Sequence, residues 1–120
     1  MALEVTMEDD GILRIKISGD MDKVAVDNLR REIKPFIEAA TAENPINSII
    51  FPENTGRISY VARRYLTDLN HNSHYGKVAI VNPPRAVRIL GKFISKATNR
   101  DNIGLFDNEE ESISWIKSNI

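Results

Sequence analysis

The chain has 120 residues, of which 42% are hydrophobic and 28% are charged, and its formal net charge is −1. This length suits one domain with its own core, and the composition is that of a globular protein rather than a disordered or fibrous one. The absence of cysteine excludes disulfides, thiolate metal sites and a cysteine nucleophile.

The chain opens with two short strands. Apolar and polar residues alternate over 3–7 and again over 13–17, and Asp9-Asp10-Gly11 lies between the two runs. Alternating runs joined by an Asp-Gly turn predict an antiparallel hairpin in which each strand is half buried.

A first helix is predicted from about residue 23 to about residue 40, with Asp22 as its N-cap and with Pro35 as the position of a kink. Apolar residues recur at helical spacing and form its buried stripe: Val26, Leu29, Ile33, Phe36, Ile37 and Ala40.

A third strand is predicted over 46–51, and a turn-rich loop over 52–57 separates it from a helix over about 59–70. The buried side of that helix is expected to hold Val61, Ala62, Tyr65, Leu66 and Leu69. The polar residues 71–76 are expected to form a loop.

The apolar run 77–81 predicts a central parallel strand, because it is apolar on both faces. Pro83 suits the first turn of a third helix, which is expected to end at about Thr98. The core side of this helix is predicted to consist of Val87, Leu90, Phe93, Ile94 and Ala97.

A last strand is predicted over 102–106, followed by a helix that Asp107 opens as part of a capping-box-like pair with Glu110. Three isoleucines are predicted to form its core face: Ile113, Ile116 and Ile120.

The resulting order is β-β-α-β-α-β-α-β-α. Strands that alternate with helices imply parallel pairing through right-handed crossovers, and the initial hairpin adds one antiparallel strand. We therefore predict a single α/β domain over residues 1–120, with a five-stranded mixed sheet and four helices. The first residues lack a basic start and an apolar signal core, and no apolar run approaches the ~20 residues that cross a bilayer, so we expect a cytoplasmic protein.

Basic residues are concentrated in one part of the chain. Residues 57–100 carry nine bases and one acid, 9 − 1 = +8, whereas residues 1–56 carry six bases and eleven acids. Four of the bases follow each other at spacings of three and four residues and would form one stripe of the third helix: Arg85, Arg88, Lys92 and Lys96. Arg57 would lie at the rim of this stripe. One interpretation is a surface that binds an acidic protein, an anionic lipid or a phosphate. The other is a solvated helix face with no binding role. Nucleic acid is not expected, because the pI is about 6.1 and the stripe of Arg85, Arg88, Lys92 and Lys96 contains no aromatic residue.

The chain shows no catalytic or cofactor signature. Glycine-rich phosphate loops are absent, and His71 and His74 lie in a predicted loop with no third strong ligand beside them, so we expect neither a metal nor a cofactor. Two helix starts, after the third and fourth strands, are expected at one edge of the sheet, where Arg57 and Arg85 would suit a small anionic ligand.

The order of elements resembles the SpoIIAA-like (STAS-type) family over nearly the whole chain. The stretch 11–29, with Ile15-Lys16-Ile17-Ser18-Gly19-Asp20-Met21-Asp22, is similar to the second strand, glycine break and first helix of that family, and Lys77-Val78-Ala79-Ile80-Val81 through Trp115-Ile116 is similar to its last third. The resemblance implies the SpoIIAA-like fold and a bacterial, non-enzymatic regulatory or binding module that acts on a protein partner or forms a homo-oligomer.

The same resemblance implies further functional possibilities. Classical members are phosphorylated at an Asp-Ser-Ser/Thr-Gly motif, and this chain has Glu53-Asn54-Thr55-Gly56 there, so Thr55 and Ser59 are the candidate phosphorylation positions. Some relatives look like CRAL-TRIO lipid-transfer domains, which implies a lipid or other lipophilic ligand, admitted by movement of the third helix near Gly91. Gly91 would either loosen that helix or permit close packing. A hydrolase or transferase that uses Ser59, His71 or His74 is the other alternative, and contact with a membrane would be peripheral at most.

Overall fold

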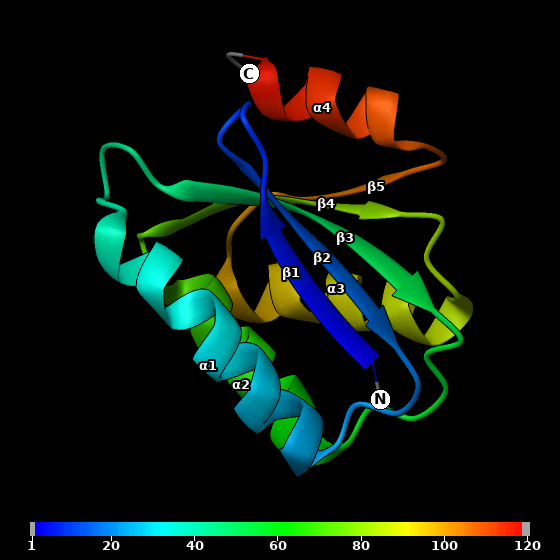
Figure 1. Ribbon diagram of the computed structural model, residues 1–120. Coiled ribbons are helices and arrows are strands. Elements are labelled where there is room, and N and C mark those ends of the chain that lie inside the picture. Colours follow the sequence, from blue (N-terminus) through cyan, green and yellow to red (C-terminus); the bar gives the residue numbers. More distant parts are fainter. Residues whose placement is uncertain (1, 119–120) are drawn as a thin grey trace.

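The computed structural model describes residues 2–118 and has five strands and four helices in the predicted order (Figure 1). The elements are β1 (Ala2–Met7), β2 (Ile12–Ser18), α1 (Lys23–Ala39), β3 (Ile46–Glu53), α2 (Tyr60–His71), β4 (Tyr75–Val81), α3 (Arg85–Thr98), β5 (Ile103–Phe106) and α4 (Glu109–Lys117). None of these helices has the length and hydropathy needed to cross a bilayer.

The strands form one sheet whose spatial order, β1-β2-β3-β4-β5, is also their order along the chain. The hairpin pairs β1 with β2 antiparallel, so that Val5 lies opposite Ile15, and the other three pairings are parallel. The predicted α/β class, the mixed sheet and the antiparallel first strand are therefore confirmed. Because the order is sequential, β1 and β5 are the two edges of the sheet.

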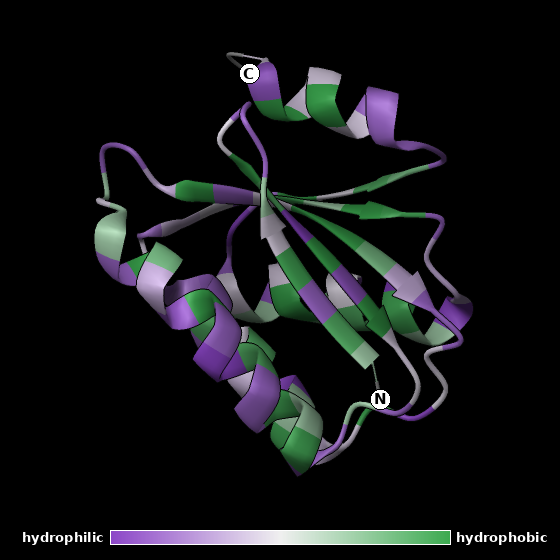
Figure 2. Cartoon of the chain, in the orientation of Figure 1, coloured by the Kyte–Doolittle hydropathy of each residue, from purple (hydrophilic) through white to green (hydrophobic). Residues whose placement is uncertain are grey.

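Helices α1, α2 and α3 cover one face of the sheet, and α4 lies on the other face (Figure 1). Buried Leu13, Val26 and Ile33 belong to the core between the sheet and the three helices. Under α4 the core is smaller and contains Ile49 and Ile116. In Figure 2 the central strands β3 and β4 are mostly hydrophobic while the outer side of α1 is mostly hydrophilic, as amphipathic packing on a sheet requires.

Charged side chains from the sheet hold both ends of α4. Arg14 of β2 is 9% exposed, and its guanidinium pairs with Asp10 at 2.7 Å and with Glu109 at 3.0 Å. The hydrogen bond from Arg14 lowers the pKa of the Asp10 carboxyl below its usual value. At the other end of α4, Lys77 Nζ donates to the carbonyl oxygens of Trp115 (3.0 Å) and Ser118 (2.9 Å), where a cation complements the helix dipole.

A buried polar network joins α2, α3 and the start of β5. The Asn70 side-chain amide donates to Thr98 Oγ1 (2.9 Å) and to Asn102 Oδ1 (3.1 Å). The Asn102 amide donates in return to Asn70 Oδ1 and to the Gly76 carbonyl oxygen, both at 2.8 Å. The three side chains are at most 8% exposed, so these hydrogen bonds are shielded from water.

Two predicted helix starts are wrong by one or two residues. Helix α3 begins at Arg85 with Pro84 as its N-cap, so Pro83 is not in the first turn. A residue that precedes a proline is pushed out of the helical conformation, and Pro83 precedes Pro84. The N-cap of α4 is Asn108 rather than Asp107, because its side-chain oxygen accepts the Glu111 amide at 2.9 Å.

The predicted loop at residues 71–76 is also partly wrong. His71 ends α2, and Tyr75 already belongs to β4, where it lies opposite Ile46 of β3. This pairing is held by contacts between segments distant in sequence, such as the Lys77 amide on Asn47 Oδ1 at 2.8 Å. A local pattern of polar residues could not reveal it. Of the predicted core residues of α4, Ile116 is buried and Ile113 packs beside it, whereas Ile120 lies outside the described residues.

Candidate partner-binding surface

One side of α3 presents a row of exposed cations. We call this row the basic face, and it consists of Arg85, Arg88, Lys92 and Lys96. Arg88 Nε donates to the Pro83 carbonyl oxygen at 3.1 Å, and within residues 2–118 no ion pair reaches any of the four. Glu109 is instead held by Arg14. The charge of the basic face is thus not neutralised by the acids at the start of α4.

A second feature lies beside the basic face, between α3 and the start of α2. Tyr60, Ile89 and Phe93 are 64%, 58% and 47% exposed, so large apolar side chains gather on one part of the surface. The guanidinium of Arg63 lies 5.6 Å from the centre of the Tyr60 ring and 5.3 Å from that of Phe93. A hollow of about 310 Å³ opens here and is lined by Ile58, Arg63, Ala86, Ile89, Leu90 and Phe93. Together with Tyr60, these residues form what we call the aromatic groove.

The exposure of Phe93 corrects the prediction that it belongs to the core. Helix α3 buries the line of Val87, Leu90 and Ile94 against the sheet, whereas Phe93 lies to one side of that line and contacts Arg63 of α2. Ala97, on the same side, is also exposed.

Val61 is a similar correction, since it is 46% exposed. The sequence analysis predicts no place in this surface for Tyr60, nor for Ile89. The signal of Ile89 was an isoleucine outside the apolar stripe of α3, next to Arg88.

The loop after β3 brings the predicted phosphorylation positions to the start of α2. Ser59 is the N-cap of α2, and its Oγ accepts the Ala62 amide at 3.1 Å. Thr55 is only 5% exposed, and its hydroxyl has no hydrogen-bond partner among the described residues. The two positions therefore differ in access, since a kinase could not reach the Thr55 hydroxyl without opening the loop.

The geometry of the same loop argues against an anionic ligand beside Arg57. The backbone amide of Arg57 donates to the Asp20 carboxylate at 2.9 Å, so that donor is already occupied by a negative group. The Arg57 side chain is exposed, as is that of Arg85 at the start of α3. An added carboxylate or phosphate would meet Asp20 at this edge of the sheet.

An apolar cavity of about 80 Å³ lies inside the domain, between the sheet and helices α1, α2 and α3. Its lining is almost entirely aliphatic and includes Ile15, Leu29, Leu66, Leu90, Gly91 and Ile103. Gly91 is buried, yet a Cβ atom added there would lie 3.7 Å from Ile103 Cγ2, an ordinary contact. Close packing therefore does not require the glycine.

The histidines are placed apart from any acidic cluster. His71 is exposed, and the His74 ring lies with Nδ1 3.1 Å from the Ile37 carbonyl oxygen. Over residues 2–118, no three side chains of His, Asp or Glu come together in a way that would hold a metal ion.

Comparison with known proteins gives a match in family and in fold. A family model described as SpoIIAA-like matches residues 12–117. An uncharacterized DUF3478-family protein from Shewanella loihica PV-4, described as having a SpoIIAA-like fold, superposes with a TM-score of 0.71 at 15% identity, over 95% of this chain and 91% of that one. No curated protein sequence matches the chain.

Two structures of SpoIIAA have the same fold. The anti-sigma factor antagonist SpoIIAA in its unphosphorylated form superposes with a TM-score of 0.66 at 16% identity, over 98% of this chain and 99% of that one. The Bacillus cell fate determinant SpoIIAA in its phosphorylated form gives a TM-score of 0.55 at 19% identity, over 97% and 100% of the two chains. At these identities the structures show a shared fold alone.

Proposed function

Because the chain belongs to the SpoIIAA-like family, we propose that it is a non-enzymatic binding or regulatory module that acts through contacts with a protein partner. The relative named an anti-sigma factor antagonist supports a regulatory role of this kind. We assign the partner surface to the aromatic groove and the adjoining basic face of α3, and we expect the partner to be acidic.

The exposed aromatic groove is the observation that carries this proposal. Tyrosine, phenylalanine and arginine are enriched where protein interfaces bury their central contacts. Here Arg63 lies between the rings of Tyr60 and Phe93, so the three side chains form one contiguous surface. The basic face next to it would steer an acidic partner and raise its association rate.

We expect Phe93→Asp to weaken partner binding by about tenfold or more, because it places a charge in the centre of an apolar contact. Reversal of charge in Arg85→Glu/Arg88→Glu is expected to weaken binding in the same direction and to reduce its dependence on salt. The partner is first isolated on the immobilised chain, and its Kd is then measured by calorimetry at several salt concentrations. For a homo-oligomer, sedimentation of the same variants replaces calorimetry.

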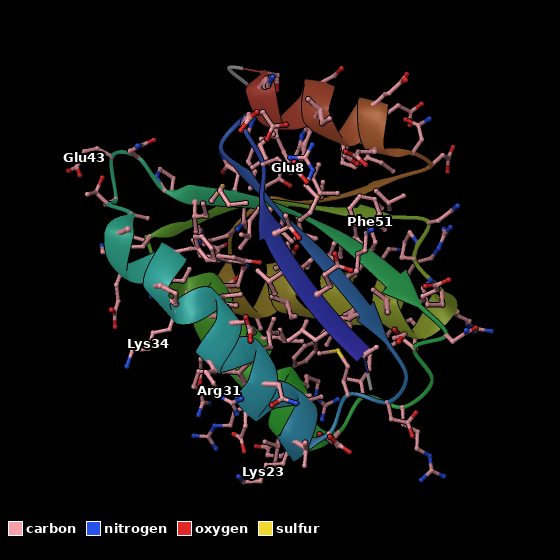
Figure 3. All side chains as sticks on the ribbon, viewed as in Figure 1. Glu8, Lys23, Arg31, Lys34, Glu43 and Phe51 are labelled. Carbon is pink, nitrogen blue, oxygen red and sulfur yellow. The ribbon has the colours of Figure 1, made fainter. Side chains whose placement is uncertain are left out.

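The matched control is Arg31→Glu/Lys34→Glu, a double charge reversal on the outer side of α1. Figure 3 shows these two side chains pointing away from the sheet, on a different helix from the basic face. The assigned surface would be contradicted if this control lowered the affinity as much as the α3 variants do. It would also be contradicted if the affinity did not depend on salt concentration.

Phosphorylation at Thr55 or Ser59 remains a prediction, and Ser59 is the more accessible of the two. A phosphate at Ser59 would lie at the N-terminus of α2, where the helix dipole favours negative charge. It would also lie next to Tyr60 of the aromatic groove and would repel an acidic partner. Modification at this position would therefore oppose binding.

The internal apolar cavity favours a lipophilic ligand as a second candidate function. Its volume of about 80 Å³ is well below the roughly 150 Å³ of an apolar cavity that holds benzene. An acyl chain would fit only if α3 moved away from the sheet. Gly91 faces both the cavity and the surface between α3 and β5, so a displacement there would open the cavity.

Gly91→Ala tests this second candidate. The added methyl group has room, so the variant is expected to gain up to about 1 kcal/mol of stability from helix propensity. If a fatty acid enters beside Gly91, the same methyl group narrows the entrance and weakens oleate binding, measured by fluorescence displacement. Unchanged oleate binding in a stabilised variant would rule out entry at this point, and native mass spectrometry would show whether any lipid co-purifies.

An enzymatic role has less support. Ser59 Oγ accepts the Ala62 amide as the α2 N-cap, and His74 Nδ1 lies against the Ile37 carbonyl oxygen, so Ser59 and His74 do not form a nucleophile and base pair. The non-enzymatic proposal would be contradicted if the protein turned over a hydrolase or transferase substrate and His74→Ala abolished that turnover.

A further inference from the structure

Strand β5 leaves one row of backbone groups unpaired at the edge of the sheet. The Val78 amide donates to the Asn102 carbonyl oxygen and the Asn82 amide donates to that of Phe106, both at 2.8 Å. In a parallel ladder, alternate residues point to the same neighbour, so the amides and carbonyls of Ile103 and Leu105 point away from β4. No described strand lies on that side. This edge can therefore accept one more strand.

A surface groove runs beside this free edge. It has a volume of about 580 Å³, and its walls come from the C-terminal half of α3 and from β5. Lys92, Ser95 and Lys96 lie on the helix wall, and Ile103 and Leu105 lie on the strand wall. Leu105 is 36% exposed, so an apolar side chain is available next to the unpaired backbone groups.

The charge of the groove is positive. Lys92 and Lys96 are exposed, and no acidic residue of the described chain pairs with either of them. Arg100 is committed elsewhere, because its Nη1 donates to the carbonyl oxygens of Asn70 (2.8 Å) and Tyr75 (3.0 Å). Asp101 is the one acid in the groove lining. A ligand that complements the groove carries negative charge on the side that faces α3.

We infer that this groove binds an extended acidic peptide segment of a partner protein, which adds to β5 as a sixth strand. The peptide backbone would pair with Ile103 and Leu105, and its alternate acidic side chains would face Lys92 and Lys96. The site goes beyond the proposed function, although it shares Lys92 and Lys96 with the basic face. It lies on the side of α3 toward β5, whereas the aromatic groove lies on the side toward α2.

The test uses a fluorescein-labelled eight-residue peptide of alternating Val and Glu, with a Val and Lys peptide of the same length as its control. We expect the acidic peptide to raise fluorescence anisotropy at low salt and to slow exchange of the Ile103 and Leu105 amide protons in NMR spectra. Lys96→Glu is expected to weaken binding by about tenfold. Leu105→Pro removes an outward amide, which an edge strand tolerates, and is expected to weaken binding at least as much.

Several outcomes would overturn the inference. These are equal binding of the two peptides, binding without protection of Ile103 and Leu105, and no binding of the acidic peptide. A further outcome is that anionic phospholipid vesicles bind and the peptide does not. If Leu105→Pro then leaves vesicle binding unchanged, the groove is a membrane-binding surface instead. Tyr60→Ala removes a ring of the aromatic groove without adding a charge beside Lys92 and Lys96, and it is expected to leave peptide binding intact. Failure of the aromatic groove as a partner surface and failure of this site are therefore distinguishable.

Discussion

Asn102→Ala is expected to lower the free energy of unfolding by about 4 kcal/mol. The change leaves Asn70 Oδ1 and the Gly76 carbonyl oxygen without their donor in a buried site, and it removes one acceptor of the Asn70 amide. Each buried polar group left unsatisfied costs roughly 1–3 kcal/mol. Because domains of this size have about 5–15 kcal/mol of stability, urea denaturation should show a large shift of the midpoint.

A double-mutant cycle with Asn70→Ala separates the network from a simple loss of packing. The double variant should cost less than the sum of the two single variants, since the second change removes a group that the first had already left unpaired. Asn28→Ala is the control, because Asn28 makes only an exposed hydrogen bond to Arg31, and its effect should stay within about 0.5 kcal/mol. Strictly additive losses would show that the two side chains do not act as a unit.

The second large effect is expected at alkaline pH and depends on Tyr75. The residue is 4% exposed, its hydroxyl lies 2.9 Å from Ser48 Oγ, and burial raises the pKa of Tyr75 to about 12. The unfolded chain ionises this phenol near pH 10, whereas the folded chain keeps it neutral until about pH 12. Ionisation of Tyr75 therefore lowers the free energy of unfolding only above pH 10. Between pH 10 and 12 its stability should fall by about 3 kcal/mol on this account.

Denaturation of the wild type and of Tyr75→Phe over pH 8–12 measures this contribution. At pH 8 the variant should be less stable, because the buried Ser48 hydroxyl loses its partner. Above pH 10 the difference should shrink and then change sign, since phenylalanine has no proton to lose. Tyr65 remains in both proteins, so the rise in its pKa cancels in the comparison. Parallel curves for the two proteins would contradict the assignment.

Most of the fold was accessible from local patterns in the sequence. The alternation around Asp9-Asp10-Gly11 and the apolar stripes of the helices depend only on nearby residues, and they were sufficient for the order of elements and the hairpin. The predictions failed where a distant residue decides the outcome. Tyr75 belongs to β4 because Ile46 pairs with it. Arg14 is a polar residue of a strand that alternation predicts to be half buried, yet it is itself buried, where it meets Glu109 from 95 residues away.

The candidate surface was only half predictable. Helical spacing was enough to gather the four cations of the basic face, since a surface stripe depends on one helix alone. The aromatic groove depends on two helices and on the angle at which α3 packs, so Phe93 was assigned to the core although it borders α2. The identity of the partner cannot be predicted from one chain, which shows only the chemistry of the surface that binds it.

The match between strand order and chain order has a consequence for how this protein folds. Each new strand can add to the edge formed by the one before it, so no strand must be inserted later between two others. Short separations between paired strands favour fast folding, and growth from the N-terminal hairpin is compatible with folding during synthesis. The pair of Arg14 with Glu109 is one exception, since it joins the first hairpin to the last helix, as does the packing of Ile12 with Ile116. We expect the pair of Arg14 with Glu109 to form late in folding, once α4 has been synthesised and packs on the sheet.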